Sequence, residues 1–153
     1  MAEYSGITQT LQPGASIVYS ITNVPCSRGL ILHDASTGNF LLRGVLQNGN
    51  YTNNNGCCRR NARNSLYMVT VGANIAVAEG GTADEISIAI AVDGGTLSNT
   101  TMRANPAAVG DFFNVSRTTN VEIFNGCCQT VTVINTSTQA IDVSEPNITF
   151  SVA

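Results

Sequence analysis

Charge is scarce in this chain, and lysine and tryptophan are missing altogether. Charged residues occupy 11% of the 153 positions, against about a quarter in a typical soluble protein. All seven basic residues are arginine, which is less strongly hydrated than lysine and is better tolerated at protein interfaces. A lysine-free surface therefore fits a subunit that is packed on several sides, although compositional drift explains it equally well.

The low content of positive charge also restricts the classes of partner. A net charge of −3 argues against nucleic acid as the main partner. No apolar run approaches the roughly 20 residues that a membrane-spanning helix needs, so we expect no membrane insertion. The segment from Met1 to Tyr4 has neither a basic start nor an apolar stretch after it. We therefore expect no secretory signal and synthesis in the cytoplasm.

Neutral polar residues and five cysteines take the place of the missing charge. Asn, Thr, Ser and Gly in such numbers are typical of extracellular and virion proteins with large subunit contacts. The cysteines suit an oxidising compartment, which conflicts with synthesis in the cytoplasm. A virion protein, made inside and working outside after lysis, removes the conflict. A spore-surface or appendage protein released from a lysed cell does so too, as does a reduced cytosolic protein with buried thiols.

Alternating apolar residues favour strand along most of the chain. Three strand faces are predicted to form the core: Ile17, Tyr19 and Ile21; Ile86, Ile88, Ile90 and Val92; and Ile148, Phe150 and Val152. Small residues opposite the second of these faces (Ser87, Ala89 and Ala91) indicate that this face is covered as well, as in a two-layer sandwich. Turns between strands at about 8–12-residue spacing indicate a β-sandwich or barrel.

The boundaries of several elements can be predicted from turn residues. Asp93-Gly94 predicts a hairpin followed by a strand through Met102, and Pro106 to Phe113 predicts a bend or one helical turn. Val115 to Phe124 is predicted to hold two short strands around Thr118-Thr119-Asn120. The Asn-rich stretch Gln47 to Gly56 is predicted to be a loop.

The order of these features resembles the jelly-roll heads of the tumour necrosis factor and complement-type superfamily. The resemblance is seen in the strand from Glu85 to Val92 with its hairpin, the segment Val121 to Gly126, the alternating run to Ile134 and the last strand. It implies an all-β fold, an antiparallel jelly-roll sandwich of about 8–10 strands, with residues 1–153 as a single jelly-roll domain.

More narrowly, the chain resembles small proteins with cysteine doublets from phages of gut Firmicutes. The matching stretches are Val24 to Gly29, Cys57 to Arg60, Gly72 to Val77, Pro106 to Val109, Phe113 to Ser116 and Gly126 to Thr130. This likeness implies a virion surface protein, a head decoration or fibre head, that is commonly a trimer. It implies no catalytic or ligand-binding residue, and we expect no enzyme activity and no cofactor.

Two cysteine doublets, Cys57-Cys58 and Cys127-Cys128, are the disulfide candidates together with Cys26. In an extended segment successive side chains point to opposite faces, so each doublet sends one sulfur to each side. If the doublets lie on neighbouring strands, one disulfide forms within the subunit and the other thiols bridge subunits. Cys26 leaves an odd count, so either one thiol is free or one bond is intermolecular. Zinc is the alternative, but it favours Cys-x-x-Cys spacing, and we expect no metal.

One arginine cluster, Arg59, Arg60 and Arg63, is the interface candidate. These guanidinium groups suit docking onto an acidic capsid, fibre or neighbouring subunit. A solvated loop edge explains the cluster equally well, and phosphate binding is disfavoured by the overall acidity.

The remaining polar groups lack the partners that catalysis needs. His33-Asp34 has no nucleophile or third partner in the sequence, so we expect a strand-end histidine followed by a turn aspartate. Asp84-Glu85 is expected to mark the solvated start of a strand. Asn-x-Ser/Thr triplets at Asn50, Asn99, Asn114, Asn135 and Asn147 are expected from composition alone. Asn48 to Asn55 with Tyr51 is a loop that could bind glycans or simply be solvated.

Three functions remain in competition. The favoured hypothesis is a non-enzymatic structural subunit that assembles with copies of itself, a trimer in particular, on a virion surface or another extracellular assembly. The second is an adhesin head of the same fold that binds receptors or glycans on a host surface. The third is a self-polymerising appendage or fibre subunit from a bacterial surface.

Overall fold

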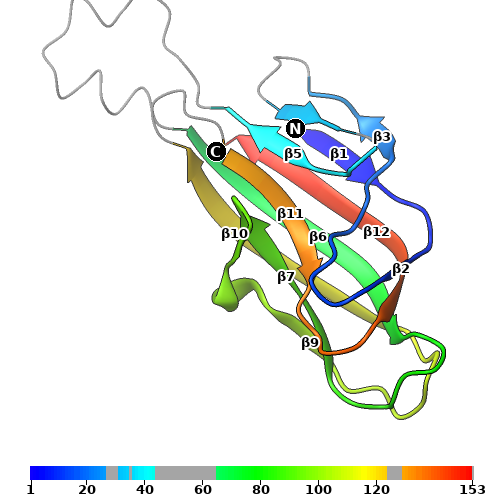
Figure 1. Cartoon of the computed structure of the whole chain (residues 1–153). Coiled ribbons are helices and arrows are strands. Elements are labelled where there is room, and N and C mark those ends of the chain that lie inside the picture. Colours follow the sequence, from blue (N-terminus) through cyan, green and yellow to red (C-terminus); the bar gives the residue numbers. More distant parts are fainter. Residues whose placement is uncertain (27–30, 35, 44–64, 124–128, 153) are drawn as a thin grey trace, which may run out of the picture.

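Two antiparallel β-sheets face each other and enclose the core (Figure 1). The computed structural model describes residues 1–26, 31–34, 36–43, 65–123 and 129–152. Their twelve strands are β1 Ala2–Ser5, β2 Gln9–Leu11, β3 Ile21–Val24, β4 Ile31–His33, β5 Phe40–Leu42, β6 Ser65–Val77, β7 Ile86–Val92, β8 Gly95–Thr96, β9 Met102–Ala104, β10 Phe113–Ile123, β11 Gln129–Asn135 and β12 Ile141–Val152, with one 3₁₀ helix, η2, at Ser98–Thr100. The predicted all-β jelly-roll sandwich is confirmed.

The first sheet has the strand order β10-β6-β12-β1-β3, with β2 paired to β12. The second sheet has the order β4-β5-β11-β7-β8, with β9 paired to β7. Pairing of Ala2 with Phe150 places the first and last strands side by side, so both ends of the chain lie at the same end of the sandwich (Figure 1). Within the described residues, no helix is long and apolar enough to cross a membrane.

Every second side chain along the strands points into the space between the sheets, as the alternation of apolar residues in the sequence predicts. Ile86, Ile88 and Ile90 are fully buried, and so are Ile148 and Phe150 on the other sheet. The opposite face of β7 is covered too, since Ala89 and Ala91 have no exposed surface. Val92, predicted as core, is only partly buried and packs against it.

The prediction for Ile21 is wrong. Ser16 forms a bridge with Ile134 of the second sheet, whereas β3 pairs with β1 of the first sheet. The chain therefore changes sheets between these two positions, and the alternation of Ile17 and Tyr19 does not continue across the change. Ile17 and Tyr19 are buried, but Ile21 is 44% exposed at the edge of its sheet.

Two predicted elements are also corrected, and one predicted turn is confirmed. The segment expected to hold two short strands is one continuous strand, β10, because each of its residues pairs with β6 from Phe113–Ile75 to Ile123–Ser65. The Asp93-Gly94 turn is confirmed, with φ of 51° and 83° as a two-residue hairpin requires. The strand expected to run from this hairpin through Met102 is instead divided into β8 and β9 by the helix η2.

Candidate functional site

Seven of the eight disulfide and interface candidates lie outside the described residues: Cys57, Cys58, Arg59, Arg60, Arg63, Cys127 and Cys128. Tyr51, from the candidate glycan-binding loop, lies outside them as well. The assignment of these residues as disulfide, interface or glycan-binding residues stays a prediction. Cys26 is described, and it is partly buried against the core. Burial raises the pKa of the Tyr4 hydroxyl, and the charge of a Cys26 thiolate beside it adds to the rise. Cys26 therefore lies against the edge of the aromatic core, and its pairing also stays a prediction.

The His33-Asp34 pair takes on the structural role expected from the sequence. The His33 imidazole donates a hydrogen bond from Nε2 to the carbonyl oxygen of Tyr19 and stacks on Phe40 at a centroid distance of 4.8 Å. The Asp34 carboxylate instead accepts hydrogen bonds from the hydroxyl and N–H of Ser36, which hold its pKa at about 2. The two side chains thus have separate partners, as a strand end and a turn require.

Three neighbouring strands of the first sheet, β10, β6 and β12, carry little charge at their outward positions. We call the solvent-accessible outward positions of β10, β6 and β12 the neutral face: Asn114, Ser116, Thr118, Asn120 and Glu122; Leu66, Met68, Thr70, Gly72 and Asn74; and Asp142, Ser144, Asn147, Thr149 and Ser151. Ala76, the remaining outward residue of β6, is fully buried. Glu122 and Asp142 are the two charged residues of the neutral face, and it has no arginine. The neutral face is therefore a surface of short amides, hydroxyls and glycine that another protein surface can approach closely.

Two large apolar side chains are exposed at one end of the neutral face. Leu66 and Met68 have 40% and 43% of their surface exposed. Tyr67, between them, and Val69, the next residue, are buried. Ordinary alternation would place polar residues at these outward positions, so apolar side chains on both sides of β6 were a detectable signal of an interface. Further along, Thr70 and Thr118 share a hydrogen bond of 3.0 Å, and so do Asn114 and Asn74. These cross-strand bonds hold the middle of the neutral face in place.

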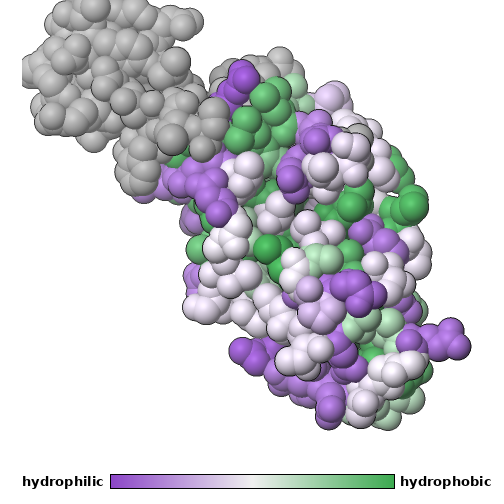
Figure 2. All heavy atoms as spheres, viewed as in Figure 1, coloured by the Kyte–Doolittle hydropathy of each residue, from purple (hydrophilic) through white to green (hydrophobic). Residues whose placement is uncertain are grey.

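A polar hollow lies on the other side of the sandwich, over β7 and β9. Its volume is about 350 Å³, and its lining residues are Glu85, Ser87, Thr96, Ser98, Thr101, Arg103, Thr136, Ser137 and Thr138. In the view of Figure 2, the surface around β9 is mostly white to purple, as this composition requires. We call this site the hydroxyl hollow.

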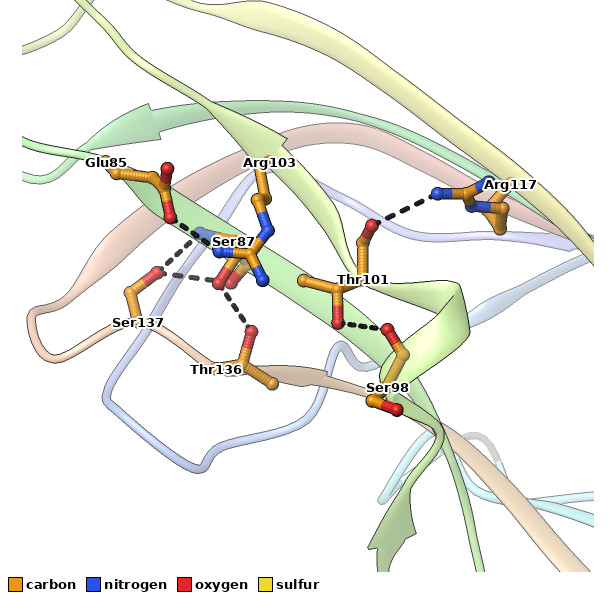
Figure 3. A network of polar contacts seen from close by, with 8 residues as sticks. All are labelled: Glu85, Ser87, Ser98, Thr101, Arg103, Arg117, Thr136 and Ser137. Carbon is orange, nitrogen blue, oxygen red and sulfur yellow. Dashed lines mark hydrogen bonds and ion pairs between the residues drawn. The ribbon is translucent and has the colours of Figure 1, made fainter.

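The floor of the hydroxyl hollow is held by β7 and by the turn that follows β11 (Figure 3). Ser87 donates its N–H to the Ser137 hydroxyl at 2.8 Å, and its carbonyl accepts from that hydroxyl at 3.1 Å. The hydroxyls of Ser87 and Thr136 are 2.6 Å apart. Ser87 is only 9% exposed, so these bonds satisfy polar groups that water reaches poorly. The backbone of Ser87 thus holds the Ser137 hydroxyl in place on the floor.

One ion pair forms the rim of the hydroxyl hollow. Strand pairing sets Arg103 directly opposite Ser87, and Arg103 donates from Nη1 to Oε1 of Glu85 at 2.8 Å. The two side chains are 62% and 46% exposed, so this pair adds little to stability. Glu85 does mark the start of β7 as expected, but its partner was not predicted because the two residues are eighteen positions apart. Among the described residues, no three or more His, Cys, Asp or Glu side chains group as metal ligands.

Comparisons with known proteins establish the fold at low sequence identity. No protein-family model matches the sequence, and no curated protein matches it either. A tumour necrosis factor, Eiger from S. frugiperda, is similar in structure, with a TM-score of 0.65, 11% identity, and coverage of 99% of this chain and 89% of that chain. The globular domain of zebrafish complement 1qA has a TM-score of 0.57, 9% identity, and coverage of 97% and 96%.

A family 35 carbohydrate-binding module from Clostridium thermocellum is less similar, with a TM-score of 0.34 and 10% identity over 95% of this chain and 90% of that chain. The first two structures show that this chain has the jelly-roll fold of tumour necrosis factor and complement-type heads. The superfamily resemblance seen in the sequence is confirmed at the level of the fold.

Proposed function

We propose that this chain is a non-enzymatic structural head that self-associates through the neutral face and belongs to the surface of a virion or another extracellular assembly. The neutral face is the observation that supports self-association most directly. Two carboxylates and no arginine stand among its outward positions on β10, β6 and β12. Burying unpaired charge in an interface is costly, so a face that is already nearly free of charge loses little on association.

The exposed apolar pair gives this interface its anchor. Leu66 and Met68 lie two positions apart on β6, so they project on the same side of the sheet. Removing their exposed surface from water is favourable, at about 25 cal/mol for each Å² buried. The resemblance to tumour necrosis factor and complement-type heads implies a trimer, and we take the trimer as the expected assembly.

The proposal that the chain is not an enzyme rests on its histidine. His33 is the chain's single histidine, and its Nε2 is bound to a backbone carbonyl while its ring packs against both Tyr4 and Phe40. A histidine held in this way anchors a strand end. This arrangement supports a structural role for the most common acid–base side chain.

Sedimentation velocity of the purified chain tests self-association. We expect a trimer for the wild type and a monomer for Met68→Glu, because the new carboxylate would have to be buried in the interface. Leu32→Glu is the matched control: Leu32 is 42% exposed, close to the 43% of Met68, but it lies on β4 of the second sheet. It should leave the trimer intact. A wild-type monomer at micromolar concentration, or equal dissociation by both variants, would overturn the proposal, and filaments would favour an appendage subunit.

The covalent part of the proposal concerns cysteine. We propose that Cys26, Cys57, Cys58, Cys127 and Cys128 form at least one disulfide in the mature assembly. Intact-mass spectrometry without reductant, after alkylation of free thiols, counts the pairs. Five alkylated thiols would refute the covalent part and leave the noncovalent trimer untouched.

The virion location needs its own experiment. Antibodies against the purified chain should label the surface of intact particles released by lysis of the cells that produce it, as seen by immunogold electron microscopy. Labelling confined to the bacterial surface or to filaments would instead support the appendage hypothesis.

A further inference from the structure

The hydroxyl hollow has a composition that selects its ligand. Seven of its nine lining residues are serine or threonine, and the other two are Glu85 and Arg103. Binding pockets for drug-sized ligands are usually lined by apolar and aromatic side chains, none of which line this one among the described residues. An apolar ligand therefore finds little apolar surface to pack against.

Charge excludes a second class of ligand. Oε1 of Glu85 and Nη1 of Arg103 are 2.8 Å apart, so the opposite charges of these two side chains cancel and the lining has no net charge. A free anion bound to Arg103 would be repelled by the adjacent Glu85 carboxylate, and a free cation bound to Glu85 would be repelled by the adjacent Arg103 guanidinium. The hydroxyl hollow thus favours a ligand that is neutral and polar.

The rim pair still offers hydrogen bonds to such a ligand. Arg103 uses only Nη1 toward Glu85, and Glu85 uses only Oε1, so further N–H donors and a second carboxylate oxygen remain open to solvent. A guanidinium and a carboxylate side by side present hydrogen-bond donors next to hydrogen-bond acceptors. Neighbouring hydroxyl groups of a ligand can then donate to one partner and accept from the other.

The floor of the hydroxyl hollow adds hydroxyl groups that are held in fixed positions. The hydroxyls of Ser87, Thr136 and Ser137 are fixed by bonds to one another and to the backbone of Ser87 (Figure 3). On the η2 side, the Thr101 hydroxyl donates to the Ser98 carbonyl at 2.9 Å, which fixes that wall as well. Walls that are already ordered lose little conformational entropy when a ligand binds.

From this geometry we propose that the hydroxyl hollow binds a neutral sugar through the Glu85–Arg103 pair and the surrounding hydroxyls. A volume of about 350 Å³ is near the lower end of the range for small-molecule sites, which suits one or two sugar rings. Because no aromatic ring lines the hollow in the described part of the chain, a single site is expected to be weak, with a Kd on the order of millimolar.

The hydroxyl hollow lies on the second sheet, whereas the neutral face is on the outside of the first. Sugar binding is therefore independent of self-association: an assembly built on the neutral face leaves the hollow open, and a monomer would bind just as well. The site is also distinct from the Asn-rich loop around Tyr51 that the sequence offers for glycans.

Saturation-transfer difference NMR with the full chain tests the site. The probes are D-glucose, D-galactose, D-mannose, L-rhamnose and N-acetyl-D-glucosamine, with D-galacturonate as the acidic comparison. We expect transfer to at least one neutral sugar, and a Kd at least tenfold weaker in both Arg103→Ala and Glu85→Ala. These side chains are 62% and 46% exposed, so both variants should fold, which circular dichroism verifies.

Arg43→Ala is the matched control, since Arg43 is also an exposed arginine but does not line the hollow. It should leave the Kd unchanged, and so should Tyr51→Ala. Four outcomes would overturn the proposal: no transfer to any neutral sugar, transfer to galacturonate alone, equal weakening by Arg43→Ala, or loss of binding in Tyr51→Ala with Arg103→Ala unaffected.

Discussion

Phe40 and Phe150 come from opposite sheets and pack with their ring centroids 4.9 Å apart, at an interplanar angle of 57°. Phe40 lies on β5 and Phe150 on β12, and both are completely buried. Phe40 also contacts the rings of Tyr4 and Tyr19 at 4.7 and 5.5 Å. One side chain of a three-residue strand therefore connects the second sheet to three aromatic rings.

Replacing Phe40 with alanine should destabilise the fold by about 3–5 kcal/mol, because the cavity left between two sheets cannot collapse readily. Urea denaturation monitored by circular dichroism measures the change. Phe113→Ala is the control, since Phe113 is 42% exposed and its loss should cost much less. Equal effects of the two substitutions would contradict the central role of Phe40.

The side chain of Asn135 makes three hydrogen bonds while only 1% exposed. Its Nδ2 donates to the carbonyls of Leu11 and Gln139 at 3.1 and 3.0 Å, and its Oδ1 accepts from the N–H of Ser137 at 2.9 Å. Asn135→Ala should therefore cost about 3 kcal/mol, because buried backbone groups lose their partners.

Asn114→Ala provides the comparison on the surface. The side-chain amide of Asn114 makes one exposed hydrogen bond to that of Asn74, so replacing Asn114 should change the stability by less than about 0.5 kcal/mol. Thermal or urea denaturation of the two variants gives the contrast. If Asn135→Ala is as stable as Asn114→Ala, the interior network does not contribute as described.

Two glycines with the same backbone conformation should respond differently to alanine. Gly38 has φ of +76°, and a Cβ there would lie 2.5 Å from Cα of Val18 and 2.7 Å from the nitrogen of Tyr19. Gly80 has φ of +88° and open space around it. Gly80→Ala should cost about 1 kcal/mol from the left-handed conformation alone. Gly38→Ala should cost several times more stability than Gly80→Ala, because backbone atoms of Val18 and Tyr19 must move. If the two variants have similar denaturation midpoints, the clash at Gly38 is relieved at little cost.

Stability should fall at alkaline pH through Tyr67. Burial raises its pKa to about 12, with a further rise from the charge of Cys26, and its hydroxyl donates to the carbonyl oxygen of Arg43. The unfolded chain ionises near the ordinary value of 10, so the contribution of Tyr67 is complete below pH 10 and is lost as the pH rises towards 12. The free energy of unfolding of the wild type should therefore decline over this range more steeply than that of Tyr67→Phe.

At pH 7, comparing Tyr19→Phe with Tyr67→Phe shows how much a buried tyrosine hydroxyl contributes to stability with and without a hydrogen bond. The Tyr19 hydroxyl is buried without a hydrogen-bond partner among the described residues. Its removal should leave the stability unchanged or higher, whereas Tyr67→Phe should lose about 1 kcal/mol with its hydrogen bond. A larger loss in Tyr19→Phe would show that its hydroxyl has a partner.

The sequence predicted those parts of the fold in which one strand alternates within one sheet. β7 is the clearest case, because the isoleucines mark the inner face and the small residues mark a covered outer one. Ile21 was misplaced because alternation carries no sign of a change of sheet. β10 was divided in two because its run of Thr118, Thr119 and Asn120 resembles a turn, and only its pairing with β6 shows otherwise.

The hydroxyl hollow could not have been predicted from the sequence. Its residues come from β7 and the residue before it, from β8, from η2 and the residue after it, from β9 and from the turn after β11. Serine and threonine are also too common in this chain to stand out. The neutral face was partly predictable, since Leu66 and Met68 break the expected polar alternation on β6. What the sequence could not supply was that β10 and β12 continue this surface on either side with one carboxylate each, Glu122 and Asp142, and no arginine.

The placement of the hydroxyl hollow on the sheet opposite the neutral face has a consequence for binding strength. If copies of the chain join through the neutral face, each copy contributes its own sugar site to one rigid particle. Sites that are individually weak then engage a repeated ligand together, and linked binding of this kind exceeds single-site affinity by about 10²–10⁴-fold. Such a particle would adhere to a surface dense in sugars and release an isolated sugar at once.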